Sequence, residues 1–163
     1  MNTQSLRTDD CVGDVIERYA AMVYRLAFAE AKSRSDADDI FQEVFLRYIN
    51  NSSAFESEEH RKAWLIRVTL NCAKKLRASS FYRRTTVLDE SISYEIKEEN
   101  DLHQALVQLP TKYSAVLHLF YYEDLSIEQI SRTLGMKPSA VRTRLTRARR
   151  ILKEKLKGEW FDV

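Results

Sequence analysis

Glycine, proline and cysteine are scarce in this chain of 163 residues, which contains three, two and two of them respectively. A β-sandwich needs many turns rich in glycine and proline, so their scarcity argues against that class. The glycines, Gly13, Gly135 and Gly158, match neither a P-loop nor a dinucleotide-binding fingerprint. The cysteines, Cys11 and Cys72, cannot form a disulfide framework or a four-cysteine zinc site.

Long apolar segments are also missing. The sequence has no run of about 18 apolar residues, and its first residues, MNTQSLRTDD, lack the apolar core of a signal peptide. We therefore expect an unprocessed protein that does not insert into a membrane. Low cysteine use is usual in the cytoplasm, and we expect this location.

Charge is distributed in four blocks of alternating sign, although the net charge is only +2. Residues 1–60 contain 6 basic and 12 acidic residues, and residues 85–125 contain 2 and 8. Residues 61–84 contain 8 basic and no acidic residues, and residues 126–163 contain 10 and 4. Solvated helix faces normally mix both signs, so these basic blocks favour contact with a polyanion, of which nucleic acid is the commonest.

Apolar residues recur at helical spacing in the first part of the chain. The spacing predicts helices over about 12–26, 35–48 and 58–77, with a polar loop at 50–53. We expect Ser35 to cap the second helix, whose first turn holds three aspartates. The predicted inner faces of the second and third helices consist of Ile40, Phe41, Val44, Phe45 and Tyr48, and of Trp64, Leu65, Val68, Cys72 and Leu76.

The periodicity is lost over residues 80–100 and returns in residues 101–163. We interpret 80–100 as a linker between two domains, the first of which covers residues 1–79. The predicted fold class is therefore all-α, with two small helical domains. Leu102, Leu106 and Leu109 are expected to share one helical face, and Pro110 to begin the next helix.

A helix-turn-helix is the strongest motif of the second domain. Ser126 and Gln129 fit a capping box, and Gly135 stands where a helix end favours a left-handed residue. Pro138 suits the first turn of a final helix that is strongly basic. Two helices joined by a short glycine-containing turn are typical of DNA-binding helix-turn-helix units.

The final helix separates an apolar face from a polar one, at about 100° per residue. Its inner arc is formed by Val141, Leu145, Ala148 and Leu152. The opposite arc and its flanks hold small polar residues and arginines, namely Ser139, Arg142, Thr143, Thr146, Arg147 and Arg150. Small side chains allow a close approach to the major groove, and arginines bind guanine edges or phosphates. An ordinary amphipathic hairpin with a charged outer face is the alternative.

Three segments together resemble the sigma-70 family of bacterial RNA polymerase sigma factors, of the small extracytoplasmic-function (ECF) type. They are DADDIFQEVFLRYI at 36–49, AWLIRVTLNCAKKLRAS at 63–79 and LPTKYSAVLHLFYYEDLSIEQISRTLGMKPSAVRTRLTRARRIL at 109–152. The resemblance covers about residues 12–157. It implies a protein that binds core RNA polymerase and directs promoter-specific initiation, with no catalytic residues and no cofactor or metal of its own.

The resemblance also assigns roles to residues of the first domain. It implies docking on the β′ coiled coil of core polymerase through Asp38, Asp39, Gln42 and Glu43. The aspartates also stabilise the positive end of a helix, and both roles are compatible. It implies contact with the -10 element and its melted single strand through Asn51, Ser52, Ser53, Phe55, Arg61, Lys62, Trp64, Arg67, Lys74, Lys75 and Arg77. For Trp64, packing in the core competes with stacking on a base.

In the second domain, the resemblance implies that the outer arc of the final helix binds the -35 element through Ser139, Arg142, Thr143, Thr146, Arg147 and Arg150. It further implies contact with the β flap of the polymerase and an anti-sigma factor as a regulatory partner. The alternatives are a helix-turn-helix regulator that binds DNA alone, a sigma mimic that titrates an anti-sigma factor, and a recombinase. A regulator of that kind would bind its operator without polymerase.

Overall fold

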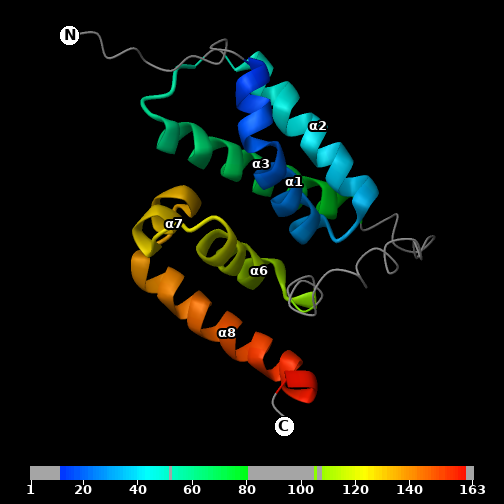
Figure 1. Ribbon diagram of the computed structural model, residues 1–163, viewed down its shortest axis with the longest axis vertical. Coiled ribbons are helices and arrows are strands. Elements are labelled where there is room, and N and C mark those ends of the chain that lie inside the picture. The colour runs from blue at the N-terminus through cyan, green and yellow to red at the C-terminus, as the bar shows by residue number, and fades with distance from the viewer. Residues whose placement is uncertain (1–11, 52, 81–104, 106–107, 161–163) are drawn as a thin grey trace. The chain divides into compact units, whose positions relative to one another are not determined.

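The computed structural model describes residues 12–51, 53–80, 105 and 108–160, whose secondary-structure elements are all helices (Figure 1). The chain divides into two compact units, Met1–Ser79 and Ser80–Val163. The fold is all-α, as predicted. Most of the predicted linker, together with Cys11, Ser52, Leu102 and Leu106, lies outside the described residues.

The first unit contains α1 (Val12–Ala31), α2 (Arg34–Asn50) and α3 (Glu58–Ser80). Helices α1 and α2 pack side by side, and α3 runs across them (Figure 1). The core between them is formed by apolar side chains at helical spacing: Val15, Met22, Val23, Leu26, Ile40, Val44, Phe45, Tyr48, Leu65 and Ile66. These side chains are at most 5% exposed, which shows that one face of each helix supplies the core.

The cap of α2 is Ser33, so the prediction of Ser35 was wrong. Ser33 has an extended backbone, and its Oγ accepts a hydrogen bond from the Asp36 amide at 3.3 Å. Helix α1 ends at Ala31, and Lys32 adopts the left-handed conformation with φ 59°. This single left-handed residue turns the chain sharply, so that the next residue already caps α2. Both serines precede the aspartates, and the sequence alone does not distinguish them.

The inner face of α3 is wider than predicted. Leu65 and Cys72 are buried as expected, but Ile66 and Thr69 are buried as well. Trp64, Val68 and Leu76 are only partly covered. A helix that crosses two neighbours has contacts on two adjoining arcs, and a single stripe therefore describes it incompletely.

The second unit contains α6 (Thr111–Leu117), η1 (His118–Tyr122), α7 (Ile127–Leu134) and α8 (Pro138–Trp160). Helix α8 packs against α6 and α7, and its predicted inner residues Val141, Leu145 and Ala148 are at most 1% exposed. The predicted helix after Pro110 continues into η1, a π-helical turn, which the sequence analysis did not anticipate. In this turn the Glu123 amide donates to the His118 carbonyl, five residues earlier.

Candidate nucleic-acid interface

The helix-turn-helix formed by α7 and α8 has the local geometry that the sequence predicted. Ser126 and Gln129 form a reciprocal capping box, with N···O distances of 3.1 and 2.8 Å. Gly135 is left-handed, with φ 65°. The Ser131 hydroxyl donates to the Met136 carbonyl and closes the turn. The capping box fixes the start of α7, whereas Gly135 and the Ser131–Met136 bond fix the angle at which α8 leaves α7 and so the direction of its outer face.

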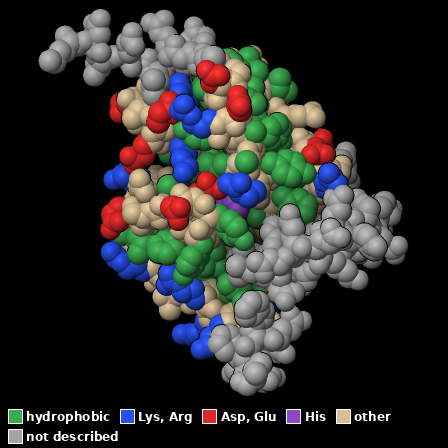
Figure 2. All heavy atoms as spheres, viewed as in Figure 1, with side chains coloured by type: hydrophobic (Ala, Val, Ile, Leu, Met, Phe, Trp, Pro, Cys, Tyr) green, Lys and Arg blue, Asp and Glu red, His purple; other side chains and the backbone are tan. Residues whose placement is uncertain are grey.

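The outer face of α8 is polar and solvent-exposed. Its exposed residues include every member of the predicted set, Ser139, Arg142, Thr143, Thr146, Arg147 and Arg150. The Thr143 hydroxyl donates to the Ser139 carbonyl and the Thr146 hydroxyl to the Arg142 carbonyl, each at 3.0 Å. Figure 2 shows Lys and Arg side chains along α8 on the visible face. The arrangement offers positive charge on both sides of short side chains, which suits a major groove.

The outer face of α2 is acidic at its start and apolar at its end. The predicted docking residues Asp38, Asp39, Gln42 and Glu43 are all exposed. Glu43 accepts a hydrogen bond from Arg47 Nε at 2.7 Å. Leu46 and Ile49 are absent from the predicted docking residues, yet they are 54% and 51% exposed. They stand four and seven residues after Gln42, and this helical spacing outside the buried stripe is the signal that identifies them.

The predicted nucleic-acid contacts of α3 fall into two groups. Arg67, Lys74 and Lys75 are exposed, and Lys62 is half-buried. Arg61, in contrast, is 3% exposed, so its side chain belongs to the interior of the unit. The exposed cations of α3 are accessible to a polyanion. Arg61 is not, because its side chain is buried.

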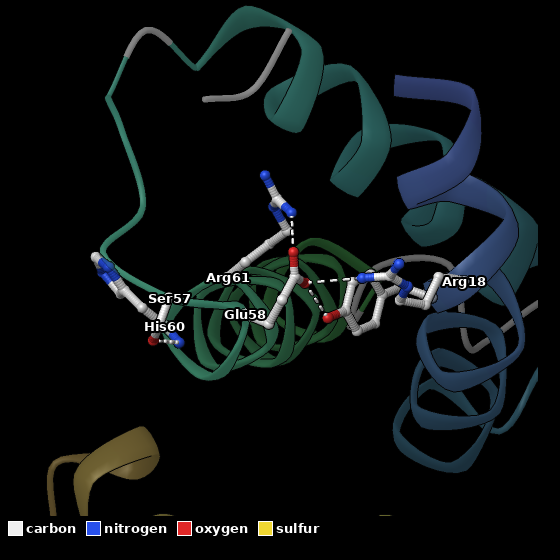
Figure 3. A network of polar contacts seen from close by, with 6 residues as sticks. Arg18, Ser57, Glu58, His60 and Arg61 are labelled. Carbon is white, nitrogen blue, oxygen red and sulfur yellow. Dashed lines mark hydrogen bonds and ion pairs between the residues drawn. The ribbon is translucent and has the colours of Figure 1, made fainter. Parts of the chain in front are cut away.

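Arg61 is held by a polar network between α1 and α3 (Figure 3). Glu58 Oε1 accepts a hydrogen bond from Arg61, and Glu58 Oε2 accepts one from the Tyr19 hydroxyl at 2.7 Å. Arg18 pairs with the same Oε2 at 3.3 Å. Burial, together with the Glu58 carboxylate, raises the pKa of Tyr19 to about 12. One carboxylate thus balances a buried guanidinium and joins two helices.

Arg77 is also tied to the fold. Its Nη1 donates to both the backbone carbonyl and the Oε2 of Glu30, at 3.1 and 3.3 Å. The side chain of Glu30 is 2% exposed and that of Arg77 is 28% exposed. Removal of Arg77 would therefore disturb the junction of α1 and α3, whatever it also contacts.

The loop before α3 combines a buried aromatic cluster with exposed polar groups. Phe55 is 1% exposed and stacks on Tyr48, with ring centroids 6.0 Å apart. Trp64 meets both rings edge-on and is half-buried. The Asn51 side-chain amide forms two hydrogen bonds of 3.3 Å with the backbone of Ser53: it donates to the carbonyl oxygen and accepts from the N–H. Phe55 therefore supports the loop from beneath, while Trp64 keeps part of its surface accessible.

The described part of the chain offers little support for a reactive cysteine, a metal site or a membrane-spanning helix. Burial raises the pKa of the Cys72 thiol, which disfavours a reactive thiolate. Among the described residues, no three His, Cys, Asp or Glu side chains are grouped as a metal site would require. Nor does any helix among them combine the length and apolarity needed to span a bilayer.

Comparisons with known proteins agree with this arrangement. Residues 15–82 match the family model of Sigma-70 region 2, and residues 99–152 match that of Sigma-70, region 4. The chain is 31% identical to the RNA polymerase sigma factor SigV of Bacillus subtilis (strain 168), over 83% of this chain and 85% of SigV. It is 26% identical to the ECF RNA polymerase sigma factor SigW of the same organism, over 91% and 90% of the two chains.

A solved structure shows the same fold. It is the sigma factor RpoE in complex with the anti-sigma factor NepR from Bartonella quintana, with a TM-score of 0.68 at 18% identity. The match covers 91% of this chain and 98% of RpoE. The two family models and the identities to SigV and SigW lead to one assignment: the chain belongs to the sigma-70 family of RNA polymerase sigma factors, in its extracytoplasmic-function group.

Proposed function

We propose that this protein binds core RNA polymerase through the outer face of α2 and promoter DNA through α3 and α8. The observation that supports this most strongly is the α7–α8 unit, whose outer face combines exposed arginines with short threonines and a serine. We assign binding of the -35 element to this face of α8. We propose a cytoplasmic location, where polymerase and promoter DNA are found.

The α2 face suits a protein partner and does not suit DNA. Asp38 and Asp39 would repel phosphates, whereas they complement a basic partner surface. Leu46 and Ile49 continue the same face with exposed apolar area, and such side chains anchor interfaces once water is excluded. We therefore extend the docking surface to Leu46 and Ile49, and assign it the β′ coiled coil.

The exposed part of α3 suits single-stranded DNA at the -10 element. Arg67, Lys74 and Lys75 offer positive charge for phosphates, and the accessible part of Trp64 offers a surface for stacking on a base. Asn51 and Ser53 stand on the loop that precedes them. We omit Phe55 and Arg61 from this set because both side chains are buried, and we treat Arg77 chiefly as a structural residue.

Regulation by an anti-sigma factor is part of the proposal. RpoE of Bartonella quintana is a sigma factor solved in complex with the anti-sigma factor NepR, and its fold matches this chain. We infer a regulatory partner of the same class here, which would cover one or both DNA-binding units. The β flap of the polymerase is the proposed partner for the second unit.

The test is reconstitution of the full chain with core polymerase, followed by mapping of transcription starts. Asp39→Arg and Ile49→Asp should each weaken core binding in a titration, while Glu17→Arg on the exposed side of α1 should leave it unchanged. Equal core affinity for all three variants would remove the α2 assignment. Tight, sequence-specific binding to promoter duplex by the protein alone would instead indicate a stand-alone regulator.

A further inference from the structure

A guanidinium–phenol pair joins η1 to α8 beside the proposed DNA-binding face. Arg149 Nε donates a hydrogen bond to the Tyr121 hydroxyl oxygen at 2.7 Å. The guanidinium also lies over the rings of Phe120 and Tyr121, at 5.4 and 5.5 Å from their centroids. Three contacts thus hold this arginine in one orientation.

The pair keeps its remaining donors available. The hydrogen bond to Tyr121 uses only Nε of Arg149, and the two terminal nitrogens carry four further N–H groups. The Tyr121 hydroxyl accepts in this bond and therefore keeps its own hydrogen to donate. Both residues are exposed, Tyr121 to 53%. The result is a set of pre-oriented donors that faces solvent and includes a positive charge.

Helix geometry places these donors at the edge of the outer face of α8. Arg149 follows Arg142 by seven residues. At about 100° per residue this is about 20° short of two full turns, so both residues stand on the same flank of α8. Tyr121 reaches this flank from the π-helical turn, where the extra residue changes the direction of the side chains that follow. Residues that flank a recognition helix meet the phosphates on the rim of the groove.

We propose that Tyr121 and Arg149 form a clamp for one backbone phosphate of duplex DNA. A terminal N–H of Arg149 and the Tyr121 O–H donate to two oxygens of the same phosphate, and Phe120 keeps the guanidinium in place. Arg149 supplies the charge, and Tyr121 acts as a positioning residue that also contributes one donor. The inference depends on the proposed function of α8, because it requires that helix to lie in the groove.

The competing explanation is a purely structural contact that fastens η1 to α8. Such a contact would affect stability but not the salt dependence of DNA binding. A phosphate contact by a cation releases counterions, so its loss makes the slope of log K against log salt shallower by about 0.9. Salt dependence therefore separates the two explanations.

The experiment measures promoter-duplex binding by the full chain assembled with core polymerase, at several salt concentrations. Tyr121→Phe keeps the ring and removes only the hydroxyl, and it should weaken binding by about threefold to tenfold on every promoter sequence. Arg149→Ala should weaken binding and make the slope shallower by about 1. In the double variant, the effect of Tyr121→Phe should largely disappear, because the two residues act as a unit.

Two variants serve as controls. Tyr122→Phe removes a hydroxyl from the neighbouring residue, whose ring stacks on His118, and it should bind DNA like the wild type. Arg147→Ala tests the proposed function itself, because Arg147 stands on the outer face of α8 and outside the clamp.

The clamp is overturned if Tyr121→Phe binds DNA like the wild type, or if Arg149→Ala leaves the salt slope unchanged while Arg147→Ala weakens binding. It is also overturned if Tyr121→Phe lowers the free energy of unfolding of the second unit by as much as it lowers the free energy of DNA binding. If Arg147→Ala and Arg149→Ala both leave DNA binding unchanged, the proposed function of α8 fails instead.

Discussion

Arg77 and Glu30 connect the C-terminal turns of α3 and α1, although 47 positions separate the two residues in the sequence. The guanidinium reaches both the backbone carbonyl and the carboxylate of Glu30, whose side chain is 2% exposed. A buried carboxylate that loses its cation costs several kcal/mol, because the desolvation penalty is no longer offset. This pair therefore limits what mutation of Arg77 can reveal about DNA.

Arg77→Ala should lower the free energy of unfolding of the first unit by about 3 kcal/mol, near the lower end expected for a buried pair because Arg77 is partly exposed. Lys74→Ala and Lys75→Ala on the same helix should change it by less than about 0.5 kcal/mol, since both side chains are exposed. Denaturant unfolding of the three variants measures the difference. Equal stabilities would show that the ion pair contributes little.

Tyr19 makes the first unit sensitive to alkaline pH. The pKa of its hydroxyl is raised from 10.0 to about 12, by burial and by the Glu58 carboxylate. Because the folded pKa lies above the unfolded one, this contribution is complete below pH 10 and is lost as the pH rises toward 12. In urea titrations from pH 9 to pH 12, the wild type should therefore lose more stability than Tyr19→Phe.

The control for this titration is Tyr113→Phe in the second unit, which should leave the pH dependence of the first unit unchanged. A stability difference between the wild type and Tyr19→Phe that stays constant across the whole pH range would contradict the assignment. The hydrogen bond itself should make Tyr19→Phe less stable by about 1–3 kcal/mol at pH 9, since its acceptor is charged.

Local signals in the sequence predicted much of the second unit and less of the first. The capping box of Ser126, the left-handed Gly135 and the start of α8 at Pro138 are each determined by a few neighbouring residues. Glu58 and Arg61 stand three residues apart, a spacing that signals an ion pair, but the burial of Arg61 depends on the fold, which places its guanidinium over the ring of Phe55. The partners Arg77 and Glu30 meet only through packing, which periodicity does not reveal.

The outer face of α2 shows the same limit. Helical spacing identifies the buried stripe and places Leu46 and Ile49 outside it, but only the packed structure shows that no neighbouring element covers them and that both are more than half exposed. The π-helical turn was missed for a different reason. Whether residue 123 bonds to a carbonyl four or five positions earlier depends on how η1 packs, and no residue of HLFYY is specific for either pattern.

Gly135 should be the residue of the helix-turn-helix most sensitive to a small substitution. At φ 65°, alanine costs roughly 1–2 kcal/mol through its backbone conformation, and an added Cβ would meet nothing within 4 Å. Gly135→Ala should therefore destabilise the second unit by that amount without a steric clash. Gly13→Ala, in ordinary helix, should instead stabilise the first unit by roughly 0.4–1 kcal/mol.

Hydrogen exchange of the slowest amides in each unit measures these opposite effects separately. Gly135→Asn provides a further check, because asparagine tolerates the left-handed conformation better than alanine. A loss as large for asparagine as for alanine would show that the cause is not the backbone conformation.

Thr146 should contribute to promoter choice through its methyl group. Its hydroxyl hydrogen is donated to the Arg142 carbonyl at 3.0 Å, so the oxygen lies against the helix backbone and has no hydrogen left for a base. The γ-methyl group then offers apolar contact, which in the major groove favours thymine. Thr143 has the same arrangement with Ser139. We therefore expect at least one thymine in the base pairs that face these two residues.

Two substitutions at Thr146 separate its methyl group from its hydroxyl. Thr146→Val keeps the methyl group and should retain the preference for the wild-type base pair. Thr146→Ser keeps the hydroxyl and should lose part of that preference. The lost discrimination between base pairs should be at most about 1 kcal/mol, which is the low end of the range for a good base contact. Transcription from a panel of single-base -35 variants, with polymerase saturated by each protein, measures both. If Thr146→Ser retains the preference and Thr146→Val abolishes it, the hydroxyl is the group that contacts the base, and its bond to Arg142 must open when DNA binds.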